Sequence, residues 1–394
     1  MDNKRPNSVR QEARIVERHS NGVVVRQITH DSQEKNNIYC ERSYCAPDSR
    51  FFVFQRRLPR KCRWENKFQA EFIACAFATG KTWKIGEGIS YPEVSPQGGF
   101  FYTRDSHGTT RELVRADLLT AKVNSIPVSG GVRPLTGMAV SPDERYLAYG
   151  VALSYRPQMF GIELVDLKMR TRRMLYRDPF IFNPHLQFEP ARGRYLLVQH
   201  NREYRFLPND RSYLPVGAVG ATLFLLSMPD GKKTCLPVGL PYTTKITGHE
   251  DWIGNSGQIL LTVNGPWNDG IRRGNLLAVG AAQPTRVVTP GGHYAHVNTS
   301  VCGRFFCCDR FRQRPNLKSG AIVIGSIKTG KTAVLCRFPV PAPRVLSRYG
   351  QSSDAHPYLS PNCRWVVYND CRSGKPQICI VNVPGQLLTG LLKR

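Results

Sequence analysis

The sequence is poor in acidic residues and contains no long hydrophobic run. Of its 394 residues, 29 are Asp or Glu and 55 are Lys or Arg, which gives a formal net charge of +26. The longest apolar stretch, residues 217–228, is shorter than the roughly 20 residues that a membrane helix needs. Residues 1–27 also lack the apolar segment and the small-residue cleavage site of an export signal. We therefore expect a soluble, cytoplasmic protein.

Motifs for structural zinc and for serine hydrolases are missing as well. The chain has 12 cysteines, but no two of them form a Cys-x-x-Cys unit. We therefore expect reduced, buried cysteines, which pack as small apolar side chains. Residues 254–258 read Gly-Asn-Ser-Gly-Gln and so depart from the Gly-x-Ser-x-Gly elbow of serine hydrolases.

The excess of positive charge indicates an acidic partner. Nucleic acid, anionic lipid and anionic saccharides all fit a chain with a pI of about 9.9. The basic residues are spread along the chain, for example at 56–61 and 170–173, and do not form one tail or helix stripe. A dedicated nucleic-acid-binding arm is therefore not expected, and a basic surface that contacts only solvent is the alternative.

What the sequence does contain is a repeated turn of the type Ser-Pro-Asp-x-Arg-aromatic, followed by alternating apolar residues. Three copies are clear and four are weaker. The aromatic or isoleucine residue that follows the turn is Phe51, Phe100, Tyr146, Tyr195, Ile259, Phe305 and Trp365. The successive spacings are 49, 46, 49, 64, 46 and 60 residues. They are typical of four-stranded propeller blades, two of which carry insertions.

These repeats predict an all-β fold, specifically a seven-bladed β-propeller. Pro and Asp favour a tight turn, and alternating residues such as 146–149 favour a strand. Helical periodicity is nearly absent. We expect the N-terminal strand 23–26 to join the C-terminal blade and close the ring, which leaves few strand edges open. Residues 1–20 are expected to be a mobile N-terminal extension, and residues 21–394 a single domain.

Residues 325–332 match the phosphate-binding pattern Gly-x-x-x-x-Gly-Lys-Thr letter for letter. A phosphate loop must open a helix. Here the strand-like residues 333–336 follow, and residues 79–82 repeat the same Thr-Gly-Lys-Thr letters in another blade. We therefore interpret the motif as a hairpin turn.

Four of the nine histidines stand shortly before turns in consecutive repeats, namely His185, His249, His296 and His356. Equivalent positions on successive blades converge on the central opening of a propeller, so these side chains can share one pocket. Gln351 and Asp354 add amide and carboxylate oxygens. This mixture of donors suits Mn²⁺ or a similar divalent cation. The alternative is that each histidine caps its own turn and binds no ion.

The same segments resemble the oligogalacturonate lyase family. The resemblance rests on His-Leu-Gln-Phe-Glu-Pro at 185–190, Gly-His-Glu-Asp-Trp at 248–252, His296, and Gln-Ser-Ser-Asp-Ala-His-Pro at 351–357. It is clear over residues 185–383, whereas the N-terminal half is similar only in its turns. That family consists of seven-bladed propellers, so the resemblance implies this fold, a lyase activity and a manganese cofactor.

The resemblance also implies roles for individual residues. His249 corresponds to the catalytic base. The manganese ligands would be His296, Gln351, Asp354 and His356, with Asp354 in place of a family histidine. His185 and His200 would line the substrate cleft. The family's substrate-contacting arginine has no counterpart, because residues 221–224 read Ala-Thr-Leu-Phe.

The implied reaction is β-elimination in a uronate. The divalent cation stabilises the enolate-like charge on the carboxylate, and a neutral histidine removes the proton at C5. The missing arginine leaves open a lyase for glucuronate- or rhamnose-containing glycans that uses His and Tyr without a catalytic metal. A non-catalytic binding propeller is a third alternative, since a fold does not fix a function. The expected partner is an anionic oligosaccharide; no membrane partner is expected, nucleic acid is the less favoured alternative, and the sequence does not indicate the oligomeric state.

Overall fold

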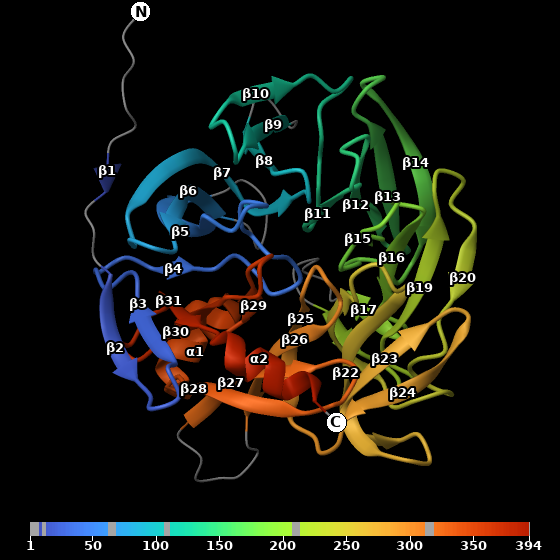
Figure 1. The fold of residues 1–394 in the computed structure, drawn as a ribbon. Coiled ribbons are helices and arrows are strands. Elements are labelled where there is room, and N and C mark those ends of the chain that lie inside the picture. Colours follow the sequence, from blue (N-terminus) through green and yellow to red (C-terminus); the bar gives the residue numbers. More distant parts are fainter. Residues whose placement is uncertain are drawn as a thin grey trace, which may run out of the picture. The chain divides into compact units, whose positions relative to one another are not determined.

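Nearly every regular element of the protein is a β-strand. The computed structural model describes residues 8–9, 13–61, 68–105, 111–206, 213–311 and 319–393. Within them, the helices are α1 (Pro343–Tyr349), α2 (Gly385–Leu392) and the short 3-10 helix η1 (Gly350–Ser353). The remaining elements form antiparallel sheets (Figure 1). The predicted all-β fold is therefore confirmed. No helix in the described ranges is long and apolar enough to cross a membrane.

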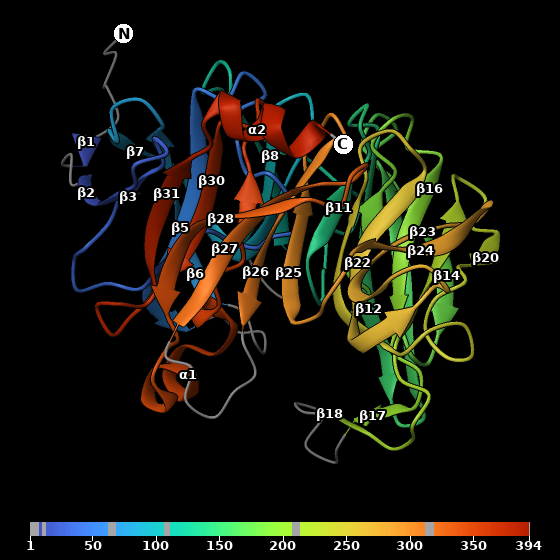
Figure 2. The same ribbon diagram turned by 60° about the horizontal axis from the view of Figure 1, so that its bottom comes forward.

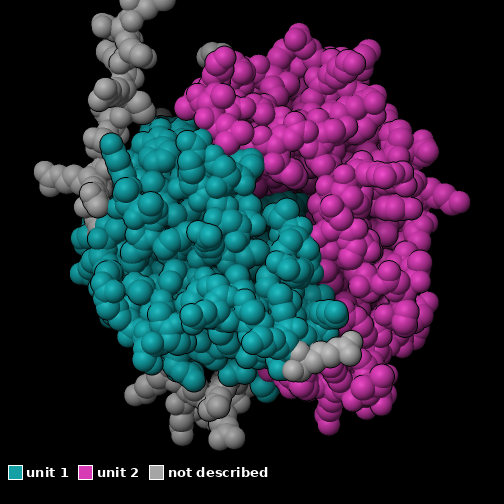
Figure 3. Space-filling model, viewed as in Figure 1, with its two compact units in different colours: residues 1–62, 68–90, 293–394 teal, residues 63–67, 91–292 magenta. Residues whose placement is uncertain are grey.

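The chain divides into two compact units, which Figure 3 shows in different colours. Unit 1 comprises residues 1–62, 68–90 and 293–394, and unit 2 comprises residues 63–67 and 91–292. Each unit is described by itself. The single domain over residues 21–394 stays a prediction.

Unit 1 contains three groups of antiparallel strands. The first is β4 (Lys35–Asn36), β5 (Phe51–Lys61), β6 (Phe68–Ala76) and β7 (Thr82–Val94) as far as residue 90, with β1 (Ser8–Val9) paired to β7. The second is β25 (Tyr294–Thr299), β26 (Phe305–Phe311), β27 (Ser319–Ser326) and β28 (Thr332–Pro339). The third is β2 (Arg14–Arg18), β3 (Val24–Gln27), β31 (Gln377–Asn382), β30 (Trp365–Asp370) and β29 (Tyr358–Leu359). Helices α1 and α2 lie at opposite ends of these strands (Figure 2).

The third group joins the two ends of the chain. Strand β3 pairs with β31, with Val25 opposite Val381, and both side chains are fully buried in the core that they share with Phe305 and Tyr368. The N-terminal strand therefore lies in the same sheet as the C-terminal strand. That this pairing closes a ring of blades stays a prediction. Residues 14–18, which were assigned to a mobile extension, form β2 and pair with β3. The rest of that extension, residues 1–7 and 10–12, lies outside the described residues.

Unit 2 contains four further groups of antiparallel strands. They are β8 (Gly99–Asp105), β9 (Arg111–Asp117) and β10 (Val123–Ile126); β11 (Met138–Val140), β12 (Tyr146–Tyr155), β13 (Gln158–Asp166) and β14 (Thr171–Asp178); β15 (Gln187–Phe188), β16 (Tyr195–His200), β19 (Thr222–Ser227) and β20 (Lys233–Cys235); and β21 (Ile246–Trp252), β22 (Gln258–Asn268), β23 (Arg273–Gly280) and β24 (Gln283–Thr289). A small hairpin of β17 (Tyr204–Phe206) and β18 (Tyr213–Pro215) completes the unit.

The seven predicted turns share one backbone conformation. In every copy, the residue two positions before the aromatic or isoleucine residue has a φ between 55° and 90°. These residues are Ser49, Gly98, Glu144, Gly193, Gly257, Gly303 and Cys363. Glycine adopts this left-handed conformation without steric cost, whereas Ser, Glu and Cys adopt it at a steric cost because they carry a Cβ atom. The sequence repeat is thus a repeat of local structure, while the number of blades stays a prediction.

The phosphate-loop pattern at residues 325–332 is a hairpin turn between β27 and β28. Gly330 has a φ of 71°, and its N–H donates to the Ser326 carbonyl at 2.9 Å. The turn around Gly80 is closely similar, with a φ of 70° and a hydrogen bond of 2.8 Å to Ala76. The hairpin interpretation is therefore confirmed.

One turn is also fixed to the neighbouring strands by a carboxylate, and its contribution can be measured. Glu144 accepts hydrogen bonds from Arg115 at 2.7 and 3.2 Å and from the Gly99 N–H at 3.1 Å. We expect Glu144→Gln to lower the free energy of unfolding by about 1–3 kcal/mol, because a partly buried, charged acceptor is lost. Urea denaturation measures the change.

A matched variant serves as the control. Glu112 pairs with Arg104 at 2.9 Å on the exposed surface, so Glu112→Gln should cost less than about 0.5 kcal/mol. Equal losses for the two variants would contradict the role assigned to Glu144.

Candidate functional site

Strand β25 presents His296 through a β-bulge. In the ladder between β25 and β26, residues 295–296 of β25 stand opposite Asp309 alone. Bulges of this kind re-aim a side chain relative to its strand. Asp309 has no exposed surface, accepts a hydrogen bond from the His296 backbone N–H at 2.8 Å, and lies 2.7 Å from His296 Nδ1. One carboxylate therefore holds both the backbone and the ring of this histidine.

The contact with Asp309 determines which nitrogen of His296 is available to a ligand. A carboxylate at Nδ1 favours the tautomer with its proton on Nδ1, in which Nε2 is the unprotonated nitrogen and therefore the one that can coordinate a cation. Burial acts to lower the pKa of His296, but Asp309 and then Asp354 outweigh it, so the pKa is raised from its usual value. The ring is thus oriented by Asp309, and the buried negative charge around it favours a positive charge at this position.

Residues 354–356, between η1 and β29, bring two more donors to His296. Asn369 donates to the Asp354 carbonyl at 2.9 Å and to the Ala355 carbonyl at 2.8 Å. Asn37 donates to the His356 carbonyl at 2.6 Å, and its own N–H bonds the Asn369 side chain at 2.8 Å. These bonds hold His356 at a φ of 44°, a conformation that non-glycine residues adopt only when their surroundings enforce it.

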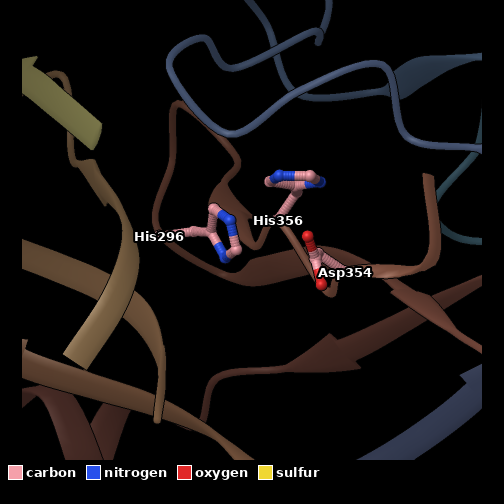
Figure 4. Close-up of side chains that lie close together, drawn as sticks. All are labelled: His296, Asp354 and His356. Atoms are coloured by element: carbon pink, nitrogen blue, oxygen red, sulfur yellow. The ribbon is translucent and has the colours of Figure 1, made fainter. Parts of the chain in front are cut away.

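The result is a cluster of two imidazoles and one carboxylate. One ligand atom each of His296, Asp354 and His356 lies within 4.8 Å of the other two (Figure 4). The histidine rings are 4.0 Å apart between centroids and are tilted by 68°, and the Tyr39 ring lies 4.7 Å from that of His356. Both histidines are buried and Asp354 is half-buried. This donor set fits a divalent cation such as Mn²⁺ or Zn²⁺.

The electrostatics of Asp354 agree with that fit. Burial raises the pKa of Asp354, and the nearby Asp309 raises it further, while His296 opposes both. A bound cation would favour the ionised carboxylate and reverse this tendency. Gln351, the fourth predicted ligand, lies in η1. Its side chain is outside the described part of the structure, so its role stays a prediction.

His249 lies in unit 2 and is also carried by a bulge. Residues 247–249 of β21 stand opposite Thr262 of β22, where the ladder register shifts. Gly248 has a φ of 88°, and a Cβ atom there would lie 3.0 Å from the Gln199 side-chain oxygen, so the bulge requires glycine. The Thr247 hydroxyl contacts Thr262 and lies 3.4 Å from His249 Nδ1. The sequence Thr-Gly-His thus turns a half-buried imidazole out of the ladder.

His185, in the same unit, lies beside a buried carboxylate. A ring nitrogen of His185 lies within 4.8 Å of a Glu250 carboxylate oxygen, and His185 Nε2 lies 2.9 Å from Asn183 Nδ2. Glu250 has no exposed surface. Gln187 donates to the Glu250 carbonyl at 2.6 Å and so connects β15 to β21.

The four predicted histidines share one register, and His200 does not. His185, His249, His296 and His356 each stand four residues before the residue that opens the turn, which is Glu189, Ile253, Ser300 or Ser360. His200 ends β16, the second strand of its sheet. It lies 3.0 Å from Asp178 and makes edge contacts with Phe180 and Phe224. Sequence reasoning missed Asp309 and Asn369, although Asp309 is the lone acidic residue of the apolar run 305–311.

The fold and the buried cluster define a class of protein: an all-β chain of antiparallel sheets with a candidate cation site. No protein-family model matches the sequence, and no curated protein matches it either. Among solved structures, the oligogalacturonate lyase of Vibrio parahaemolyticus is similar, with 14% identity, a TM-score of 0.70, and 97% of this chain and 99% of that chain covered.

An oligogalacturonate lyase in complex with manganese gives 14% identity, a TM-score of 0.71 and the same two coverages. The β-propeller domain of the Trilobed protease from Pyrococcus furiosus gives 12% identity and a TM-score of 0.48 over 88% of this chain and 96% of that chain. The likeness at 14% identity is one of fold: this chain has the fold of the oligogalacturonate lyases.

The geometry of the cluster predicts how it responds to loss of Asp309. We expect Asp309→Asn to weaken Mn²⁺ binding about 10–100-fold, because the amide no longer orients and polarises His296. Titration calorimetry with Mn²⁺ measures the affinity. His356→Ala should weaken binding further, whereas His19→Ala, at an exposed histidine of β2's hairpin, should leave it unchanged. An unchanged affinity in the folded Asp309→Asn protein would contradict the assigned role.

Proposed function

We propose that this protein is a lyase that cleaves uronate-containing oligosaccharides, oligogalacturonides in particular, by metal-assisted β-elimination. One observation carries the proposal. A chain with the fold of a lyase that has been solved with manganese places two buried histidines and a carboxylate within 4.8 Å of one another. The proposal includes a seven-bladed propeller whose ring is closed by the pairing of β3 with β31.

The metal site in this proposal is formed by His296, Asp354 and His356, with Gln351 as a further ligand. Asp309 orients His296 from behind. When bound, a divalent cation neutralises the uronate carboxylate and stabilises the enolate-like charge that develops on it. Asp354, which stands where the resemblance would place a histidine, adds negative charge to the site and so favours retention of a hard cation such as Mn²⁺.

His249 is the proposed base. It would accept the C5 proton as the C4–O bond breaks and a C4–C5 double bond forms. Thr247 Oγ1 lies 3.4 Å from Nδ1, and Nε2 is the nitrogen proposed to take the proton. His185, beside Glu250, and His200, oriented by Asp178, are proposed to line the cleft. The net charge of +26 supports an anionic substrate, because positive potential raises the rate of encounter with uronates.

The activity can be tested by the absorbance of the unsaturated uronate product. We expect purified protein to release this product from short oligogalacturonides with Mn²⁺ present and to stop releasing it with chelator. Product formation that survives the chelator would favour the metal-independent lyase. Absence of product in a protein that binds one Mn²⁺ per chain would keep the metal site and exclude this substrate.

The base is tested by His249→Ala, which should lower kcat about 10²–10⁴-fold, the usual contribution of a positioned proton acceptor. Mn²⁺ content, measured by elemental analysis, should stay constant, because His249 is not a proposed ligand. His19→Ala is the matched control and should retain full activity. Retained turnover in His249→Ala would remove the residue from the base role.

A further inference from the structure

The shared turn conformation contains a place for a hydrogen-bond acceptor at its third residue. In the turn that starts at Ser141, Asp143 Oδ1 accepts the Ser141 hydroxyl at 2.6 Å and the Arg145 backbone N–H at 3.1 Å. Asn362 accepts the same two bonds, at 2.8 and 3.0 Å, in the turn that starts at Ser360. In both turns, one side-chain oxygen of the third residue accepts the serine hydroxyl and the backbone N–H of the fifth residue.

In the turn that starts at Ser300, this acceptor is a sulfur atom. Cys302 Sγ lies 3.3 Å from the Ser300 hydroxyl, and the Arg304 backbone N–H donates to it. The Arg304 side chain donates as well. A thiolate, like an aspartate carboxylate, is an anionic hydrogen-bond acceptor. The donors at this position therefore favour a deprotonated Cys302 over the thiol. The hydrogen bond from Cys363 and those from Ser300 and Arg304 lower the pKa of Cys302 to about 4.

A second cysteine lies beside the first. The strands that lead into the two turns are bonded to each other, because the Leu359 N–H donates to Asn298 Oδ1 at 2.8 Å, and the side chains of Cys302 and Cys363 interact across these turns. Cys363 is buried and has a φ of 59°, at the position where Gly303 stands in the preceding turn. Cysteine thus occupies a left-handed position that glycine fits without strain.

We propose that Cys302 and Cys363 form a peroxide-sensitive dithiol, with Cys302 as the attacking thiolate and Cys363 as the resolving thiol. Cys302 Sγ attacks one oxygen of hydrogen peroxide, the O–O bond breaks, and hydroxide leaves and takes up a proton to form water. The Cys363 sulfur then attacks the sulfenic sulfur, the S–O bond breaks, and a second water leaves. Two thiols lose two electrons and two protons, and one peroxide becomes two waters.

The surroundings make this reaction selective. Cys302 is exposed and stands next to Val301, which is 63% exposed, so peroxide can reach it. Among the cysteines in the described ranges, Cys235 on β20 is the other exposed one, and the rest are buried. Cys235 therefore serves as an internal reference for reactivity.

The test is mass spectrometry of the full-length protein after treatment with hydrogen peroxide. We expect the intact mass to fall by two hydrogen atoms, and peptide mapping to show a Cys302–Cys363 linkage that dithiothreitol reverses. Iodoacetamide at mildly acidic pH should alkylate Cys302 at least tenfold faster than Cys235. Absence of the linked peptide, or equal alkylation of Cys302 and Cys235, would overturn the proposal.

The sibling turns supply variants that are expected to fold. Cys302→Asp restores the residue found at Asp143 and should keep the melting temperature while abolishing the linkage. Cys363→Gly restores the residue found at Gly303 and should stop the reaction at the sulfenic acid, which dimedone traps on Cys302. A folded Cys363→Gly protein without that adduct would exclude Cys302 as the attacking thiolate.

Discussion

The left-handed residue of each repeated turn is the constraint on which the rest of the structure depends. Because side chains alternate along a strand, a slip of one residue would move every core side chain to the wrong face. The turn prevents such a slip by fixing where the strand after it begins, as at Tyr146 after Glu144 or Phe305 after Gly303. The turn also fixes the spacing of the residues that precede it in the chain. It places four histidines at one equivalent position, four residues before the turn opens.

The site departs from this register where a side chain has to be re-aimed. His249 and His296 both lie in bulges near the start of the first strand of their sheets, and in each case one residue of the neighbouring strand stands opposite the bulge. Asp309 bonds the backbone and ring of His296, and Thr262 contacts the threonine beside His249. A bulge removes ladder hydrogen bonds, and these side chains replace part of what is lost. The distortion is therefore supported by the strand next to it.

The sequence predicted what repeats and could not predict what is specific to one strand. The turn residues follow from local chemistry, so the strands that begin at Phe51, Tyr146 and Trp365 could be anticipated. The bulges depend on a partner strand, and nothing in the letters around His296 indicates Asp309, which is 13 residues away. Cys302 is a case in between. A cysteine in the sequence does not indicate a hydrogen-bond acceptor. Its position is identified as an acceptor position only by comparison with the hydrogen bonds that Asp143 and Asn362 accept in their turns.

The charges around His296 support a cation more directly than the fold does. In a chain with a net charge of +26, the carboxylates of Asp309, Asp354 and Glu41 all act on this one buried imidazole. Buried carboxylates are costly unless positive charge compensates them, so acids gathered around one buried imidazole favour an additional positive charge. Protonation of Asp354 would relieve its repulsion with Asp309 but would remove one negative charge from the site. The raised pKa of Asp354 is a shift in that direction. A divalent cation relieves the repulsion without that loss, because its charge compensates the ionised carboxylates directly.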